Sequence, residues 1–425
     1  MRAGSARRVT ASTVAALLVA LCVPVAVHLA WARQDPAPVL ARAPVRQGPA
    51  PVASPDQRHF AVTWAASGER LGAGPPERSY RLVVRTSVGG DALRIRLTNA
   101  FGEHPVTFAS AYAGLQRQGA ELIQGSNRPL TFGGQTSVTV AAGEVILSDP
   151  LPGELAPESN LVVSLHVTGA LGMRSGHILA LQTSYAGAGD HAAEEAATNW
   201  AETLNSWYWL DAVSVRTSTA VGSVVVLGDS ITDGFASSTD TNRRWPDYLS
   251  RRLQATPDSP VRGVANEGIS GNKVLAGGAG PAALRRFDRD VLSHPGVDTV
   301  FVHEGINDIK AHTGVTVDDL TAGYRQLVDR AHAAGRCVVG ATVMPYKGWP
   351  EYDDAGEAVR QGVNDWIRHS GVFDAVVDFD EVTRSPDDPR ALLPIFDGGD
   401  HLHPNDRGMQ AMADAVDLAV LRCDR

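Results

Sequence analysis

Residues 223–232 read Ser-Val-Val-Val-Leu-Gly-Asp-Ser-Ile-Thr, a continuous apolar run that leads directly into a polar turn. An apolar run of this length, without alternation of polar residues, predicts a β-strand that is buried on both faces. Similar runs recur at Thr299–His303, Cys337–Val343 and Ala375–Phe379, and segments of helical length separate them. Strands of this kind that alternate with amphipathic helices predict an α/β domain, in which helices cover both faces of a parallel sheet.

One of the intervening segments carries helix signals at both of its ends. Thr316 is a candidate N-cap, and Gly335 is a candidate stop. Between them, apolar residues recur at helical spacing and share one face. These residues are Leu320, Tyr324, Leu327, Val328 and Ala331.

The chain before this domain has a different pattern, with period two and frequent turn residues. Tyr80–Arg85 and Leu93–Thr98 flank Gly89-Gly90-Asp91, which predicts a hairpin of half-buried strands with its arginines in water. Many short strands and few helical stretches predict a β-sandwich. We therefore expect a β-sandwich-like domain at residues 58–217 and the α/β domain at residues 218–425. Further strands are expected at Ser137–Val140, Asn160–Val167 and Ile178–Tyr185.

The first 57 residues belong to neither domain. Three arginines precede an apolar run at about Val14–Leu29, which ends in Ala30-Trp31-Ala32. This order is typical of a secretory signal peptide, so we expect residues 1–32 to be removed and the protein to be secreted. An uncleaved signal anchor is the alternative. Residues 33–57 are rich in Pro and Ala, which predicts an extended linker.

Charge and cysteine content limit the partners. The formal net charge is −9, and it becomes about −12 without the three arginines of the signal. A chain this acidic, with no basic run, is expected to bind neither nucleic acid nor, after signal cleavage, a membrane. Cys337 and Cys423 remain in an oxidising compartment, and the predicted topology brings both to the same end of the α/β domain. We therefore expect them to form a disulfide.

Polar blocks follow the predicted strands, where a parallel sheet collects its functional side chains. Ser230 lies in a Gly-Asp-Ser turn that can present its hydroxyl at the edge of the sheet. Residues 266–272 (Asn-Glu-Gly-Ile-Ser-Gly-Asn) contain glycines that let the backbone approach a ligand closely. Asn307, in Glu-Gly-Ile-Asn-Asp, has an amide that can donate to an oxyanion. Each of these blocks alone is also compatible with an ordinary turn.

The fourth block is Asp400-His401-Leu402-His403-Pro404-Asn405. An acid three residues before a histidine can fold back in one turn and hold the imidazole Nδ1–H, which leaves Nε2 free to take a proton from a serine. The His401 and His403 pair also suggests a metal site. Zinc needs a third ligand, however, and no paired Cys or His-Glu motif offers one. We therefore expect neither a metal nor a cofactor.

Taken together, the four blocks, between about residues 222 and 420, resemble those of the SGNH (GDSL-type) hydrolase superfamily. The resemblance implies a flavodoxin-like, three-layer parallel-sheet domain and the activity of a serine esterase. By the match of motifs, Ser230 is the nucleophile, His403 the base and acid, and Asp400 the residue that orients His403. The same match assigns the oxyanion hole to Ser230, Gly271 and Asn307.

Two assignments have rivals. Gly268 competes with Gly271, but Ile-Ser-Gly-Asn looks like the family's segment, so we expect Gly271 to be the donor. Asp397 competes with Asp400, although its spacing to His403 fits less well. Ser230 lacks the Gly-x-Ser-x-Gly elbow of the other common serine-hydrolase pattern, which disfavours an ordinary α/β-hydrolase.

The order of the two domains is similar to that in a bacterial SGNH subgroup, the arylesterases and acylhydrolases found beside xylanases. The similarity includes Gly-Ile-Asn-Asp around Asn307 and the pair Trp245-Pro246. It implies an ester substrate, often an acetyl group on a polysaccharide. The absence of a lid-like apolar segment favours a short acyl chain.

An aromatic cluster permits two interpretations, sugar stacking or core packing at the junction of the domains, and the core is favoured. The cluster consists of Trp200, Trp207, Tyr208 and Trp209. Two other functions stay open. One is a lipase or phospholipase-type acylhydrolase, and the other is a secreted sugar-binding protein with a vestigial hydrolase domain.

Overall fold

A computed structural model describes residues 60–169, 172–217, 222–256, 259 and 261–422. All of them fall within one compact unit, Ala53–Arg425. The predicted signal peptide, residues 1–32, and the predicted linker, residues 33–57, lie outside the described residues and stay predictions.

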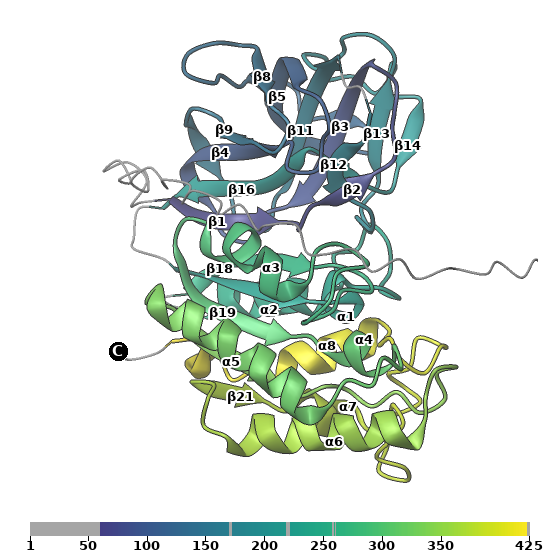
Figure 1. Ribbon diagram of the computed structural model, residues 1–425. Helices are drawn as coiled ribbons and strands as arrows, with labels where there is room; N and C mark the ends of the chain where they lie inside the picture. Colours follow the sequence, from purple (N-terminus) through teal and green to yellow (C-terminus); the bar gives the residue numbers. More distant parts are fainter. Residues whose placement is uncertain (1–59, 170–171, 218–221, 257–258, 260, 423–425) are drawn as a thin grey trace, which may run out of the picture. The chain divides into compact units, whose positions relative to one another are not determined.

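The described residues before 218 form antiparallel sheets that enclose a core (Figure 1). Apolar side chains from both large sheets meet there, among them Leu82, Ile95, Val163 and Val213. The expected β-sandwich-like domain is therefore confirmed.

One sheet has the order β1 (Phe60–Ala65), β16 (Leu210–Arg216), β4 (Gly90–Thr98) and β10 (Leu151–Leu155), with β9 (Val145–Leu147) beside β4. The other has the order β14 (Glu202–Leu204), β13 (Ser184–Gly187), β3 (Glu77–Arg85), β11 (Asn160–Thr168), β5 (Val106–Gln118) and β6 (Glu121–Leu122), with β7 (Arg128–Pro129) and β8 (Val138–Val140) beside β5. A small third sheet contains β15 (Trp207–Tyr208), β12 (Arg174–His177) and β2 (Glu69–Leu71).

The predicted hairpin between Tyr80–Arg85 and Leu93–Thr98 is wrong. β3 pairs with β11 and β13, whereas β4 pairs with β16, β10 and β9, so the two strands belong to different sheets. The expectation that the arginines face water also fails for Arg81, which is buried and donates to the carbonyl oxygens of Ala120 and Glu194. Fixed acceptors replace water around this guanidinium. The strand expected at Ile178–Tyr185 is largely a loop between β12 and β13.

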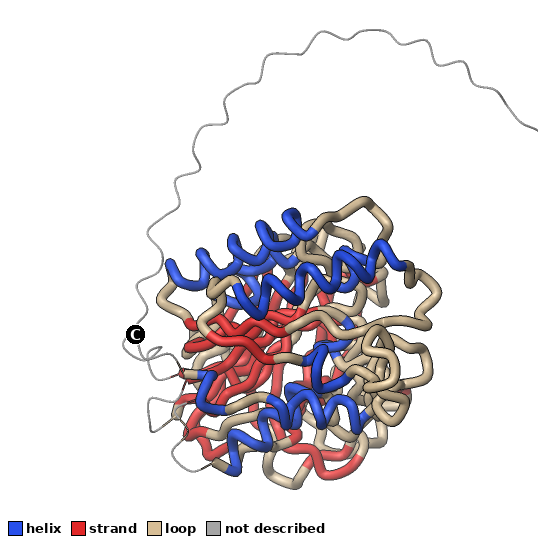
Figure 2. Tube along the Cα trace, turned by 90° about the horizontal axis from the view of Figure 1, so that it is seen from below, coloured by secondary structure: helices blue, strands red, loops and turns tan. Residues whose placement is uncertain are grey.

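The remaining strands form a parallel sheet in the order β18-β17-β19-β20-β21. In chain order this is 2-1-3-4-5, the flavodoxin-like arrangement. Figure 2 shows helices on both sides of the strands, which confirms the expected three-layer α/β domain. The strands are β17 (Gly222–Gly228), β18 (Val261–Gly268), β19 (Val297–His303), β20 (Cys337–Ala341) and β21 (Ala375–Val377). The α-helices are α1 (Ser230–Asp233), α2 (Trp245–Ala255), α3 (Ala283–Phe287), α4 (Ile306–Ile309), α5 (Val317–Ala333), α6 (Asp354–His369), α7 (Phe379–Thr383) and α8 (Asp406–Ala415). A π-helical turn, η2 (Asp288–Leu292), follows α3, and a 3-10 turn, η3 (Leu418–Leu421), follows α8.

The helix predicted after Thr316 is α5, and its end signals are confirmed. The Thr316 hydroxyl accepts from the Asp319 N–H at 3.2 Å, and the Asp319 carboxylate accepts from the Thr316 N–H at 2.9 Å. This reciprocal pair is a capping box, which satisfies two main-chain donors that the helix itself leaves unpaired. The chain turns at Gly335, where φ is +71°. The five apolar residues expected on one face are all buried.

The parallel register brings three polar segments to one edge of the sheet. Gly228 at the end of β17 pairs with Gly268 of β18 on one side and with His303 of β19 on the other. The segments that follow these three strands therefore begin side by side. They contain Ser230, Gly271 and Asn307.

The two domains share contacts across their junction. The Val62 N–H of β1 donates to the Pro295 carbonyl at 2.9 Å, and the Ser223 hydroxyl of β17 donates to the Val62 carbonyl at 2.8 Å. The Val62 side chain packs into the core of the α/β domain. β1, the first strand of the β domain, thus also packs against the α/β domain.

No helix in the described ranges is long and apolar enough to cross a membrane. Cys337 is buried at the start of β20. Cys423 lies outside the described residues, so the expected disulfide stays a prediction.

Candidate active site

Ser230 opens a short helix directly after the central strand. β17 ends at Gly228, Asp229 is the N-cap of α1, and the Asp229 carboxylate accepts from the Ile231 N–H at 3.0 Å. A Cβ at Gly228 would come within 2.2 Å of the Thr232 hydroxyl, so a side chain there would displace the helix. This tight turn fixes the position of the Ser230 hydroxyl at the edge of the sheet.

The structure brings Ser230, His403 and Asp400 together. The Ser230 Oγ lies 2.8 Å from His403 Nε2, and His403 Nδ1 donates to Asp400 Oδ2 at 2.6 Å. The second carboxylate oxygen accepts from the main-chain N–H groups of Leu402 at 3.0 Å and of His403 at 2.8 Å. The carboxylate is therefore anchored by its own turn, and it holds the imidazole with Nε2 toward the serine.

Burial and charge keep this histidine neutral. Burial lowers the pKa of His403 below its usual value, the Asp400 carboxylate partly offsets this, and Lys310 lowers it further. Burial alone raises the pKa of Asp400, but hydrogen bonds from the main chain and the ring of His403 lower it overall. At neutral pH the pair is therefore an imidazole beside a carboxylate. Such a pair can accept the proton of a serine hydroxyl as that hydroxyl attacks a carbonyl carbon.

Gly271 and Asn307 lie on adjacent segments that a hydrogen bond joins. Asn307 Nδ2 donates to the carbonyl of Asn272 at 2.9 Å, and Asn272 directly follows Gly271. Gly271 has a φ of +82°, a left-handed conformation that favours glycine. Among the described residues, neither the Ser230 nor the Gly271 main-chain N–H finds an acceptor. Both donors are thus available to a ligand at the edge of the sheet.

The two rival residues have other partners. Asp397 accepts from His401 Nδ1 at 2.6 Å and from the main-chain N–H groups of Gly399 and His401. Among the described residues, no hydrogen bond or ion pair joins its side chain to His403. Gly268 is the last residue of β18, and an added Cβ there would come within 2.3 Å of the Asp233 main-chain nitrogen. Gly268 therefore allows α1 to pack against β18.

Aromatic side chains flank His403 on two sides. The ring centroids of Phe235 and His403 lie 4.4 Å apart, and Phe235 is 43% exposed. The ring of Trp349 packs edge-on against His403, with 5.8 Å between the ring centroids. Lys310 Nζ lies over the Trp349 ring at 4.7 Å. An open groove starts at Trp349 and is lined further along by Tyr352, together with Lys347 and Asp388, which form an ion pair.

The sequence patterns did not single out Phe235, Trp349 or Tyr352. Trp349 follows β20, so the rule that functional side chains follow parallel strands gives a signal for it. In the aromatic cluster of the β domain, Trp207 and Trp209 belong to the core, whereas the buried Trp200 packs against the Arg81 guanidinium. Within the part of the chain that the structure describes, no three His, Cys, Asp or Glu side chains converge as they would around a metal ion.

Residues 226–411 match the model of the GDSL-like lipase/acylhydrolase family. Among solved structures, a GDSL-like lipase from Bacteroides thetaiotaomicron is 22% identical over 47% of this chain and 87% of its own, with a TM-score of 0.38. A catalytic mutant of an acetylxylan esterase from Geobacillus stearothermophilus is 24% identical over 46% of this chain and 94% of its own, with a TM-score of 0.36. A carbohydrate acetylesterase family member from Sinorhizobium meliloti is 18% identical over 47% of this chain and 99% of its own, with a TM-score of 0.39. No curated protein sequence matches the chain.

Proposed function

We propose that the protein is a secreted serine esterase, because residues 226–411 match the model of the GDSL-like lipase/acylhydrolase family. Its substrate is a short acyl group, such as acetyl, on a carbohydrate. The observation that carries the proposal is the chain of two hydrogen bonds from Ser230 through His403 to Asp400, at 2.8 and 2.6 Å.

The reaction proceeds through an acyl-enzyme. The Ser230 oxygen attacks the ester carbonyl carbon while its proton passes to His403 Nε2, and the carbonyl oxygen becomes an oxyanion. The main-chain N–H groups of Ser230 and Gly271 and the Asn307 amide donate to this oxyanion. When the intermediate collapses, the bond to the sugar oxygen breaks and His403 returns the proton to that oxygen. Water then attacks the acyl-enzyme with His403 as base, which releases the carboxylic acid and restores Ser230.

Asp400 orients and stabilises the base throughout the cycle. Its carboxylate holds Nδ1–H in place, so the lone pair of Nε2 faces Ser230. When His403 becomes an imidazolium, the same carboxylate offsets its charge. Asp400 itself stays ionised, because the hydrogen bonds from His403 lower its pKa overall.

The surface beside the triad supports a short acyl group. Lipases need a broad apolar surface near the site, on the order of several hundred Å². In the described part of the α/β domain, Phe235 and Ile395 are the only large apolar side chains that are substantially exposed. This area suits an acetyl or similarly short chain rather than a fatty acyl chain.

The groove beside the triad supports a carbohydrate as the alcohol part of the ester. Trp349 and Tyr352 offer aromatic surface, and the paired charges of Lys347 and Asp388 offer hydrogen bonds at the same groove. Sugar rings present apolar faces and polar edges, which aromatic and charged side chains of this kind bind together. The proposal of secretion depends on the signal-peptide pattern of residues 1–32.

The proposal is tested with p-nitrophenyl esters from two to sixteen carbons, assayed beside acetylated xylan. We expect kcat/KM to be highest for the shortest chains, with release of acetate from xylan. Trp349→Ala is expected to reduce kcat/KM on xylan about tenfold more than on p-nitrophenyl acetate, because only the polymer fills the groove. A maximum at long chains would show a lipase instead, and equal losses on both substrates would remove the carbohydrate groove from the proposal.

A further inference from the structure

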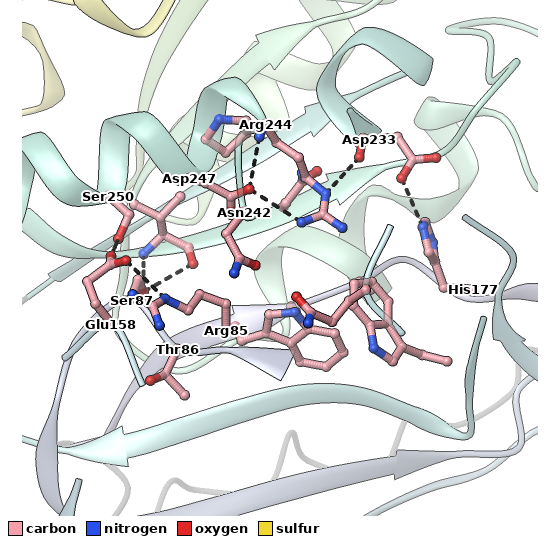
Figure 3. Close-up of a pocket in the computed structure, with 18 residues that line it drawn as sticks. Arg85, Thr86, Ser87, Glu158, His177, Asp233, Asn242, Arg244, Asp247 and Ser250 are labelled. Carbon is pink, nitrogen blue, oxygen red and sulfur yellow. Dashed lines mark hydrogen bonds and ion pairs between the residues drawn. The ribbon is translucent and has the colours of Figure 1, made fainter. Parts of the chain in front are cut away.

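His177 reaches from the β domain into the α/β domain. It is the last residue of β12, and its Nε2 lies 2.9 Å from Asp233 Oδ1, where both residues are 3% exposed (Figure 3). Asp233 is the last residue of α1, the four-residue helix that begins with Ser230. A side chain of the β domain thus holds the far end of the nucleophile's helix.

Asp233 also holds the segment that carries Gly271. While one carboxylate oxygen faces His177, the other accepts from the Ser270 main-chain N–H at 3.0 Å and from the Ser270 hydroxyl at 2.6 Å. Ser270 directly precedes Gly271. The Asp233 carboxylate therefore bridges two groups of the proposed site, the nucleophile and an oxyanion donor.

The surroundings of His177 require it to be a cation. Nδ1 faces the Ser67 carbonyl at 3.0 Å, and Nε2 faces the Asp233 carboxylate and the Leu179 carbonyl. All three partners are acceptors, and only an imidazolium donates from both ring nitrogens. Burial alone lowers the pKa of His177, but Asp233, the Ser67 carbonyl and Glu69 together outweigh burial and raise the pKa to about 9.

Ser67, whose carbonyl accepts from His177, makes a second contact that reaches the site. The Ser67 hydroxyl accepts from the buried Arg286 guanidinium at 2.7 Å. Arg286 also donates to the Gly228 carbonyl at 2.9 Å and to the Asn272 side chain at 2.9 Å. Gly228 lies two residues before Ser230, and Asn272 follows Gly271. The β domain is therefore linked to both segments twice, once through Asp233 and once through Arg286.

The space at this junction is too small for a ligand. A cavity of about 40 Å³ lies between the domains and is lined by Ser87 and Glu158 of the β domain and by Asp233 and Arg244 of the α/β domain (Figure 3). A buried water needs about 10–15 Å³ of such space, so the cavity has room for about three waters. Binding of a substrate or cofactor therefore does not explain the charged groups here.

We propose that His177 is a positioning residue for the esterase reaction, and that the β domain contributes to catalysis by supplying this residue. The inference rests on the proposed function, because it takes Ser230 as nucleophile and Gly271 as oxyanion donor. Through Asp233, the imidazolium sets the distance between these two groups. Small displacements of reacting groups, on the order of 1 Å, reduce rates about a hundredfold.

The test compares His177→Gln with His166→Gln, a matched substitution in the β domain. His166 is also buried and also lies near two acids, Glu77 and Asp190, but both acids belong to the β domain. With p-nitrophenyl acetate, we expect His177→Gln to lower kcat about ten- to a hundredfold and to change KM little. His166→Gln is expected to keep the wild-type kcat.

The dependence of kcat on pH provides a second test, because a merely structural role of His177 would not change it. Asp233, Glu69 and Arg244 are the charged groups around His177. In the wild type, kcat should fall as pH rises through about 9, because the imidazolium then loses its proton. In His177→Gln this fall should be absent. Any fall caused by Lys310, which is near the triad, would remain in both proteins.

Ser270→Ala tests the same bridge from the other side without changing the β domain. It should lower kcat several-fold, and the double variant with His177→Gln should lose less than the product of the two single effects, because both act through Asp233. If His177→Gln does not fold, Ser270→Ala and the wild-type pH profile decide the matter. Wild-type kcat in His177→Gln, with only the Tm lowered, would overturn the inference. Activity retained in Ser230→Ala would instead overturn the proposed function.

Discussion

Replacing Asp400 with asparagine exchanges one carboxylate oxygen for an NH₂ group. The hydrogen bonds to the other oxygen can stay. In the wild type, Asp400 Oδ1 accepts from the main-chain N–H groups of Leu402 and His403, and Oδ2 accepts from His403 Nδ1. In Asp400→Asn, the amide oxygen keeps the two main-chain bonds, so the NH₂ group takes the place of Oδ2. It then donates to Nδ1, and the ring must carry its proton on Nε2, facing Ser230.

This tautomer has no lone pair for the serine proton. We expect kcat/KM to fall about a thousand- to ten-thousandfold, which corresponds to about 4–5.5 kcal/mol of transition-state stabilisation. The pKa of His403 also falls further, because burial and Lys310 lower it and Asp400 no longer raises it. Since the base must be neutral, the acid limb of the residual activity should move to lower pH.

The assay is kcat/KM for p-nitrophenyl acetate as a function of pH, with Asp397→Asn as control. Asp397 lies in the same loop and accepts three hydrogen bonds of the same kinds. Their donors are the main-chain N–H groups of Gly399 and His401 and the Nδ1 of His401. This control should stay within about threefold of the wild type, because His401 does not contact the serine. A large loss in Asp397→Asn together with a small loss in Asp400→Asn would refute the assignment of the orienting acid.

Two further predictions follow from the same geometry. Asn307→Ala should reduce kcat about a hundred- to a thousandfold with little change in KM, because its amide acts mainly on the oxyanion; a raised KM with unchanged kcat would make Asn307 a substrate-binding residue. Cys337 and Cys423 should be joined by a disulfide, since the Leu421 carbonyl accepts from Thr299, which is the register partner of Cys337. Closing so long a loop contributes up to about 5 kcal/mol to the free energy of unfolding, so reduction should lower Tm and leave activity intact. Two free thiols in an unreduced digest of the secreted protein would disprove the bridge.

The local elements of the fold were predictable because their signals are local. The ends of α5 follow from Thr316 and Gly335, and its buried face follows from helical spacing. β17 and β19 follow from apolar runs that lie close to their observed bounds. β18 was not among those runs, because Val261–Gly268 contains Arg, Asn, Glu and two glycines.

Pairing between distant strands was not predictable in the same way. Alternation of side chains reports the two faces of a strand, but it does not report the neighbour. Tyr80–Arg85 and Leu93–Thr98 therefore suggested a hairpin, although their partners are β11 and β16. Arg81 is buried for a similar reason, since its acceptors come from residues 39 and 113 positions away.

The site also contains residues that local motifs predict and a residue that depends on a distant contact. The motifs around Ser230 and His403 are short, and the parallel topology brings them to one edge of the sheet. His177 has no motif, and it lies 56 residues before Asp233 in a different domain. Only the packed structure reveals that contact.

The identity of the nucleophile is the central claim, and covalent labelling tests it most directly. The purified protein is treated with a serine-reactive phosphonate, and the modified residue is located by mass spectrometry of a digest. We predict a single label, on Ser230, with loss of activity in proportion to labelling. Ser230→Ala should fold normally, take up no label and have no esterase activity, because only the attacking hydroxyl is missing. A label on another residue, or esterase activity in Ser230→Ala, would contradict the account.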